Sequence, residues 1–205
     1  MFERILANKL KTAANQFPVL TVTGPRQSGK TTLVQAVFKD YEYLSLELPD
    51  QRQFALEDPR GFLDQFKGPV ILDEVQRAPE LFSYIQVLVD EHRDWSGRFI
   101  LTGSQNFLLL QSISQSLAGR CAVLHLLPFS LAELVNRKPV PLDKLGKATT
   151  KKQKTRQADL LETLFTGFYP RIHDKGLPPR DWLASYYQTR SEERRVGKEC
   201  TVLCR

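Results

Sequence analysis

A glycine-bounded loop is the first part of the sequence that could carry chemistry. Residues 24–31 (GPRQSGKT) fit the pattern G-x-x-x-x-G-K-[ST] at every fixed position. Glycines let backbone N–H groups turn inward around phosphate oxygens, and a helix beginning near Lys30 adds a dipole of about half a positive charge. We therefore predict a site for the phosphates of a nucleotide and favour it over the alternative, a glycine-bounded loop without function. The predicted site consists of Gly24, Pro25, Arg26, Gln27, Ser28, Gly29, Lys30, Thr31 and Thr32.

A phosphate site of this kind also needs groups that hold a metal and activate water. Within the loop, Lys30 would contact the β- and γ-phosphates, and the Thr31 hydroxyl would bind Mg²⁺. Residues 70–72 (VIL) are apolar throughout and precede Asp73 and Glu74, as in a buried parallel strand that ends at the carboxyl edge of a sheet. Asp73 would hold Mg²⁺ through water, and Glu74 would be the general base. The alternative for this acidic pair is a solvated turn.

Two further positions could take part in the same chemistry. Ser104, with Thr102 and Gln105 as alternatives, ends a strand-like run and could contact the γ-phosphate or the attacking water; a capped strand end is the alternative. Arg120 follows a helix and could sense the γ-phosphate in cis or reach a neighbouring subunit as an arginine finger. An ordinary surface ion pair is the alternative for this arginine.

The elements that must position these residues alternate between strands and helices. Short β-rich runs predict strands at 18–23, 41–46, 70–72, 98–102 and 121–126. Apolar residues at helical spacing predict helices at 2–15, 30–39, 81–89, 107–117, 130–136, 159–168 and 181–188, with an acidic helical region through 66. The alternation predicts an α/β fold, in which helices flank a mostly parallel five-stranded sheet.

Composition and charge limit the remaining classes. The 205 residues carry a net charge of +6, but residues 137–156 alone hold eight basic side chains and one acidic one. We interpret this segment as a solvated linker rather than a nucleic-acid-binding arm. No run is apolar enough for a membrane span, and neither the three cysteines nor His92, His125 and His173 have the spacing of a metal site. We expect a cytoplasmic protein in a reducing compartment.

Several motifs in order carry a family resemblance. They are residues 24–33 (GPRQSGKTTL), 55–59 (ALEDP), 72–82 (LDEVQRAPELF), 99–104 (FILTGS), 116–120 (SLAGR) and 127–133 (LPFSLAE). Over residues 1 to about 189 the chain resembles the prokaryotic AAA-type P-loop ATPases, whose N-terminal AAA domain is followed by a C-terminal domain of unknown function. The resemblance implies Walker A roles for Lys30 and Thr31, Walker B roles for Asp73 and Glu74, and a sensor near Ser104.

The resemblance also implies a division of the chain. We expect an ATPase domain at 1–136, a lysine-rich linker at 137–157 and the truncated, helical start of a C-terminal domain at 158–189. Residues 190–205 look like the in-frame translation of a sequencing adaptor, so we expect a non-native tail. The Trp182, Leu183, Tyr186 and Tyr187 stripe would then be exposed, because its partner is missing.

The expected function is Mg²⁺-dependent hydrolysis of ATP to ADP and phosphate, coupled to movement of the C-terminal domain. The alternative is a nucleotide-gated binding or regulatory module with negligible turnover. A small-molecule kinase is less favoured, because a glutamate beside the metal-binding aspartate suits water as the nucleophile. The sequence leaves a protein partner, DNA and a second copy of this chain as alternative partners. The family resemblance implies a chemistry but no biological pathway.

Overall fold

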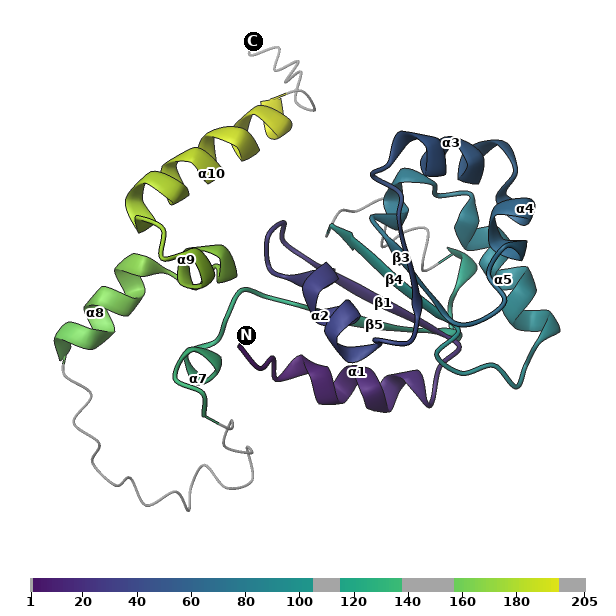
Figure 1. Cartoon of the computed structure of the whole chain (residues 1–205), viewed down its shortest axis with the longest axis horizontal. Helices are drawn as coiled ribbons and strands as arrows, with labels where there is room; N and C mark the ends of the chain where they lie inside the picture. Colours follow the sequence, from purple (N-terminus) through teal and green to yellow (C-terminus); the bar gives the residue numbers. More distant parts are fainter. Residues whose placement is uncertain (1, 105–114, 138–156, 196–205) are drawn as a thin grey trace, which may run out of the picture. The chain divides into compact units, whose positions relative to one another are not determined.

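The alternating strands and helices of the sequence form a parallel sheet with helices on both faces (Figure 1). This computed structural model describes residues 2–104, 115–137 and 157–195. The strands are β1 (Val19–Gly24), β2 (Glu42–Ser45), β3 (Val70–Asp73), β4 (Phe99–Ser104) and β5 (Cys121–His125), in the order β2-β3-β4-β1-β5. Every pairing is parallel, so all the carboxyl ends of the strands lie at one edge of the sheet. The predicted fold class is therefore confirmed.

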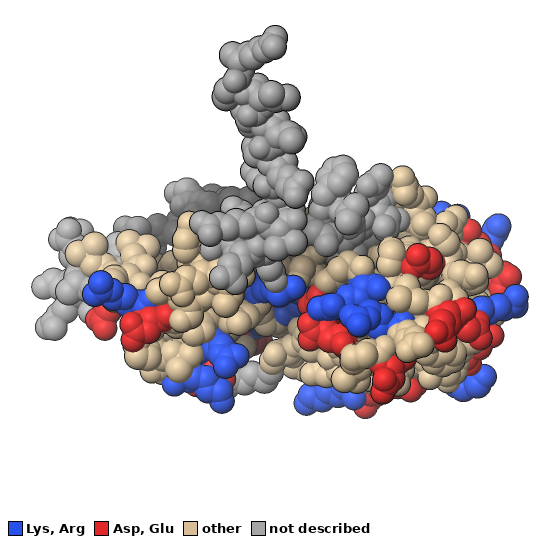
Figure 2. All heavy atoms as spheres, turned by 90° about the horizontal axis from the view of Figure 1, so that it is seen from above, with Lys and Arg blue, Asp and Glu red and all other residues tan. Residues whose placement is uncertain are grey.

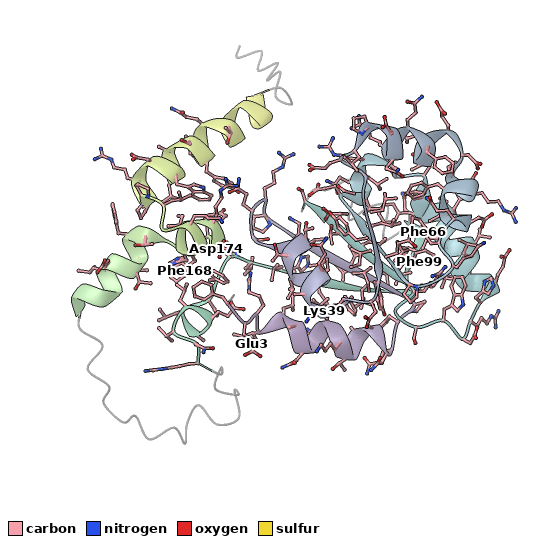
Figure 3. The ribbon with its side chains drawn as sticks, viewed as in Figure 1. Glu3, Lys39, Phe66, Phe99, Phe168 and Asp174 are labelled. Atoms are coloured by element: carbon pink, nitrogen blue, oxygen red, sulfur yellow. The ribbon has the colours of Figure 1, made fainter. Side chains whose placement is uncertain are left out.

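The two faces of the sheet carry separate hydrophobic cores. Side chains of alternate strand residues point to opposite faces. Leu20, Ile71 and Ile100 pack with α1 (Leu6–Ala14) and α2 (Lys30–Val37). Their neighbours in sequence, such as Leu72, Phe99 and Leu101, pack with α3 (Pro49–Glu57), α4 (Pro59–Asp64) and α5 (Leu81–Glu91). Figure 3 labels Phe66 and Phe99, which both belong to this second core.

The helices differ from their predicted bounds where local backbone geometry intervenes. A short 3-10 helix, η1 (Val75–Arg77), follows β3 and was not predicted. The predicted helix 130–136 is shortened to α7 (Leu131–Leu134), because Asn136 adopts a positive φ of 50° that stops the helix. Most of the predicted helix 107–117 lies outside the described residues.

The chain divides into the units Met1–Pro139 and Val140–Arg205. In the second unit, α8 (Gln157–Thr166) and α10 (Pro179–Arg195) match predicted helices, and α10 extends beyond residue 188. The intervening helix α9 (Pro170–Lys175) was missed, because its flanking proline and glycine suggested only a turn. Pro170 instead occupies the first helical turn, and Gly176 ends the helix with a left-handed backbone.

The aromatic stripe of α10 is less exposed than expected. The Trp182 and Tyr186 rings stack on each other at 5.1 Å, and the Tyr169 ring lies 5.1 and 4.9 Å from them. Leu183 is also half-buried. Of the four residues in the stripe, only Tyr187 is exposed, with 74% of its surface accessible. Tyr169, which precedes α9, supplies the packing that the sequence did not reveal.

Candidate functional site

The carboxyl edge of the sheet brings the predicted chemical groups together. Strand β4 lies between β1 and β3. Gly24 at the end of β1 pairs in register with Ser104 at the end of β4, and Leu72 pairs with Leu101. Asp73 therefore ends β3 level with Thr102, one strand away from the phosphate loop. The ends of three neighbouring strands, β3, β4 and β1, therefore lie side by side at this edge.

The loop 24–31 has the backbone that a phosphate site requires. Gly24, Gln27 and Gly29 have φ values of 152°, 61° and 90°. The helix α2 begins at Lys30, directly after Gly29, and no side chain among the described residues caps its start. Its first N–H groups have no intrahelical acceptors, so this end of the helix is suited to bind an anion.

Two polar side chains of the loop, Lys30 and Ser28, are buried. Lys30 is 6% exposed, and its Nζ donates to the carbonyl oxygens of Gly24 and Pro25, both at 3.1 Å. Ser28 is fully buried, and its Oγ has no hydrogen-bond partner among the described residues. A buried ammonium and a buried, unpaired hydroxyl in a glycine-bounded loop match the requirements of a phosphate group. Arg26, Gln27 and Thr32 are exposed.

Asp73 is the centre of the hydrogen-bond network at this edge. Thr31 Oγ1 donates to its Oδ1 and Oδ2 at 3.0 and 3.1 Å, and Thr102 Oγ1 also donates to Oδ1. Asp73 is 6% exposed, so these donors replace the water that a carboxylate would otherwise bind. Thr31 and Asp73 together present hydroxyl and carboxylate oxygens, the donor set that Mg²⁺ prefers, so these residues fit a magnesium site.

Tyr43 is a member of this network that sequence reasoning missed. Its hydroxyl donates to Asp73 Oδ2 at 3.0 Å. Burial, the negative charge of Asp73 and the hydrogen bond to it together raise the pKa of Tyr43 to about 12. Tyr43 pairs with Ile71 in the β2–β3 register, and Asp73 lies two residues after Ile71 on β3. Because side chains alternate between the two faces of a sheet, Tyr43 and Asp73 lie on the same face. The adjacency of β2 and β3 was the missing information.

Glu74 has an unusual backbone and an engaged carboxylate. Its φ and ψ are 57° and 44°, a left-handed conformation that is uncommon for a residue other than glycine and clusters at functional sites. Its amide donates to Thr102 Oγ1 at 3.4 Å, and Gln76 Nε2 donates to its Oε2. Gln76 was also not predicted. Thr102 thus links both acidic residues to β4.

The remaining predicted side chains differ in their positions. Ser104 lies beside Gly24, and its buried Oγ has no partner among the described residues, so it is available to a group bound at this edge. Gln105 lies outside the described residues.

Arg120 is at the other end of the sheet. Its carbonyl accepts from the amide of Val19, the first residue of β1, whereas the phosphate loop follows the last. Its guanidinium pairs with Asp90 at 2.5 and 2.8 Å, and this hydrogen bond lowers the pKa of Asp90. A sensor role in cis is therefore not supported, because the arginine is separated from the loop by the length of β1. The surface ion pair left open by the sequence is present.

The distribution of charge is visible over one face of the described residues. On the face shown in Figure 2, basic and acidic side chains of the described residues lie interspersed. Residues 138–156, which hold most of the lysine-rich segment, are outside the described ranges. Over those ranges there is no cluster of three metal-ligating side chains and no helix long and apolar enough to cross a membrane.

Two known proteins are similar to part of this chain in sequence. An uncharacterized protein of Mycobacterium tuberculosis and one of Mycobacterium bovis are each 37% identical over 124 residues, or 60% of this chain. The matched region spans only 28% of the length of these relatives.

Solved structures with lower sequence identity are also similar. A Walker-type ATPase of Pyrococcus abyssi is 20% identical, with a TM-score of 0.46 over 72% of this chain and 62% of that one. AMPPCP-bound DnaA of Aquifex aeolicus is 18% identical, with a TM-score of 0.49 over 83% of this chain and 57% of that one.

A family model described as "AAA domain" matches residues 16–135. The matched segment begins before β1 and ends just after α7, so it contains every strand of the sheet together with Lys30, Asp73 and Ser104. It covers more than half of the chain and supports nucleotide binding of the ATPase type. The chain belongs to the AAA domain family.

Proposed function

We propose that this chain binds ATP with Mg²⁺ and hydrolyses the nucleotide to ADP and phosphate. The observation that carries the proposal is the contact between the Thr31 hydroxyl and Asp73, at the point where the phosphate loop meets the end of β3. This contact joins the two oxygen ligands expected for magnesium, directly beside a helix N-terminus suited to phosphate.

The phosphates would bind along the loop and at the start of α2. Lys30 Nζ already lies within the loop, 3.1 Å from two of its carbonyl oxygens, and a phosphate would exchange these neutral acceptors for a charged one. The Oγ atoms of Ser28 and Ser104, which have no hydrogen-bond partner among the described residues, would complete the contacts. Bound Mg²⁺, held by Thr31 and through water by Asp73, would neutralise charge on the phosphate oxygens.

Glu74 would then act on the attacking water. The water oxygen forms a bond to the γ-phosphorus, the bond from that phosphorus to the bridging oxygen breaks, and the water proton passes to the Glu74 carboxylate. Positioning and deprotonation by a general base contribute about 10²–10⁴ in rate. Thr102 forms hydrogen bonds with both the Asp73 carboxylate and the Glu74 amide. It would therefore fix the position of the metal-binding residue Asp73 relative to the general base Glu74.

A substitution of Lys30 tests the binding step. Lys30→Ala removes the buried ammonium and is expected to abolish binding of a fluorescent ATP analogue. Lys39→Ala is the matched control, because Lys39 is exposed just after α2 and should leave the affinity unchanged. Equal affinity in the two variants would contradict the proposed site.

One observation favours the second candidate, a nucleotide-gated binding module with negligible turnover. The Glu74 carboxylate is already engaged by the Gln76 side chain, so it is not held ready for water. Single-turnover hydrolysis distinguishes the two candidates. An ATPase converts bound ATP to ADP in one turnover, whereas a gated module retains the bound ATP. In either case, Gln76→Ala would remove the hydrogen bond from Gln76 to the Glu74 carboxylate. The proposal also includes coupling of nucleotide turnover to movement of the C-terminal unit and binding of a protein partner. It further includes a role for Arg120 at the nucleotide site of a neighbouring subunit.

A further inference from the structure

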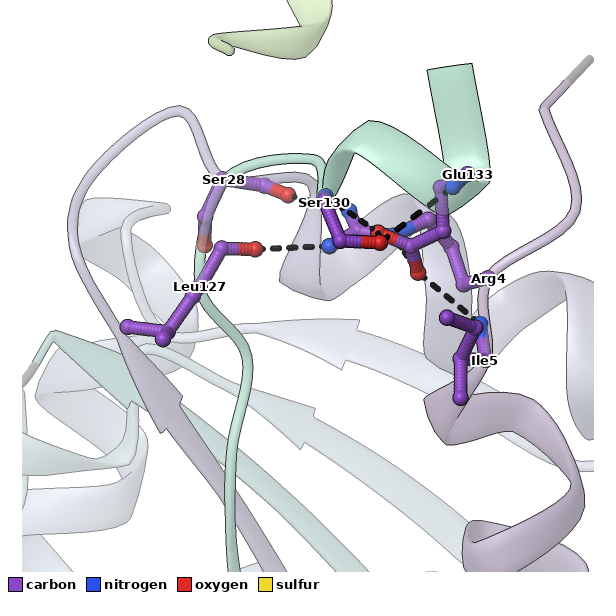
Figure 4. Close-up of polar contacts among 6 residues, drawn as sticks. All are labelled: Arg4, Ile5, Ser28, Leu127, Ser130 and Glu133. Carbon is purple, nitrogen blue, oxygen red and sulfur yellow. Dashed lines mark hydrogen bonds and ion pairs between the residues drawn. The ribbon is translucent and has the colours of Figure 1, made fainter. Parts of the chain in front are cut away.

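Arg4, close to the N-terminus, connects segments that are far apart in the sequence (Figure 4). Its Nε donates to Glu133 Oε1 at 3.1 Å, one terminal nitrogen donates to the carbonyl oxygen of Ser28 at 2.8 Å, and the other to that of Leu127 at 2.6 Å. The guanidinium therefore contacts the phosphate loop, the segment after β5 and the helix α7 at the same time. Neither the phosphate-loop motif nor the Walker B pair requires this residue.

The arginine is fixed from all sides. Its side chain is 9% exposed, and that of Glu133 is 6% exposed. The guanidinium lies 4.8 Å from the centre of the Phe129 ring, which in turn packs against Phe2. A planar guanidinium with several bonded donors and a stacked ring has little freedom to reorient.

Glu133 is held equally firmly. It accepts from the amides of Ile5 and Ser130, both at 2.8 Å, and forms the capping box that starts α7. Burial alone would raise the pKa of Glu133, but the hydrogen bonds from Ser130 and Ile5 and the charge of Arg4 lower it below its ordinary value. The carboxylate is thus a charged anchor for Arg4.

The bond to Ser28 has a consequence for the phosphate loop. A peptide unit is planar and trans, so its C=O and N–H groups point in opposite directions. Arg4 holds the Ser28 oxygen, and the Gly29 N–H of the same peptide therefore points away from Arg4. Gly29 has a φ of 90° and directly precedes α2, in the part of the loop whose amides would bind phosphate.

We propose that Arg4 is a positioning residue for the phosphate loop, which sets the orientation of the Ser28–Gly29 peptide and ties it through Glu133 to α7. This inference rests on the proposed nucleotide binding. In sequence, α7 is the last described helix of the first unit, and Arg4 links the loop to it through Ser28 and Glu133. Because coupling between two sites is reciprocal, nucleotide at the loop should also stabilise α7.

Two variants test the positioning role. Arg4→Lys keeps the positive charge but cannot hold Glu133, Ser28 and Leu127 together, and it should weaken binding of ATP and ADP by about tenfold or more. Arg60→Lys is the matched control, because it makes the same substitution at an exposed arginine of α4, outside the Arg4–Glu133 network. Its affinity should equal that of the wild type. Equal affinities in Arg4→Lys and wild type would overturn the proposal.

Hydrogen exchange of the intact wild-type chain provides a measurement that needs no variant to fold. Saturation with ADP should slow the amide exchange of α7 as well as that of residues 24–31. Slowing at the loop with no change at α7 would overturn the connection through Glu133.

If the wild type binds neither ATP nor ADP, the proposed function fails, and the free proteins still test Arg4. Residues 24–31 should exchange faster in Arg4→Lys than in wild type or Arg60→Lys. Equal exchange in all three would refute the positioning role itself.

Discussion

Gly24 is a position where a single methyl group should have a large effect. Its φ is 152°, and a Cβ built on it would lie 2.1 Å from the carbonyl oxygen of Leu126. That oxygen has little room to move, because the Leu126 amide donates to the carbonyl of Thr23 at 2.8 Å, on the residue just before the glycine. Gly24→Ala must therefore distort either the end of β1 or the chain that follows β5.

The magnitude follows from two contributions. A residue with a Cβ in this backbone conformation costs about 1–3 kcal/mol of strain. Forcing extra volume against packed backbone costs about another 1–3 kcal/mol. We therefore expect Gly24→Ala to lower the free energy of unfolding by about 2–6 kcal/mol, a large part of the stability of a typical domain. The loop begins at this residue, so nucleotide binding should weaken as well.

Urea unfolding followed by circular dichroism measures this loss, with Gly68→Ala as the matched control. A Cβ on Gly68 would meet nothing within 4 Å, so its effect should stay within about 0.5 kcal/mol. If Gly24→Ala is as stable as Gly68→Ala, the close contact with Leu126 and the argument built on it are wrong.

Three further variants test separate parts of the structure. Tyr43→Phe removes one donor from the Asp73 carboxylate and should lower the unfolding free energy by about 0.5–1.5 kcal/mol in urea; an unchanged midpoint would contradict the network. Arg120→Ala removes an exposed pair with Asp90, so the urea midpoint and single-turnover hydrolysis by the monomer should both match wild type, and a slower reaction would restore a sensor role in cis. Burial raises the pKa of the Cys121 thiol from 9.0 to about 11. The neutral thiol therefore contributes stability that is complete below pH 9 and is lost as the pH rises toward 11. Relative to Cys121→Ala, the free energy of unfolding of the wild type should fall by up to about 3 kcal/mol over this range. A parallel pH dependence of the unfolding free energy in the two proteins would refute this expectation.

Local patterns predicted the parts of the site that are local in the chain. The loop 24–31 combines a buried strand, two glycines and a helix start within a few residues, so its position and backbone could be anticipated. The same holds for β3, where a short apolar run ends in Asp73. A parallel sheet then places such strand ends at one edge without further information.

The missed contacts of Tyr43 and Arg4 depend on the pairing of segments that are distant in sequence. Tyr43 reaches Asp73 only because β2 is the neighbour of β3, and Arg4 reaches Glu133 across 129 positions. Arg120 shows the reverse case. Its residue type suggested a phosphate sensor, but the direction of β5 places it at the edge opposite the loop.

Single-turnover hydrolysis by Glu74→Gln tests the central claim most directly. The substitution preserves the shape of the side chain and its contact with Gln76 but removes the base. Enzyme in excess over labelled ATP and Mg²⁺ is quenched at intervals, and ADP is measured beside a binding titration. Glu74→Gln should bind ATP with wild-type affinity and hydrolyse it more slowly than wild type by a factor of about 10²–10⁴. Hydrolysis by Glu74→Gln at the wild-type rate would contradict this expectation.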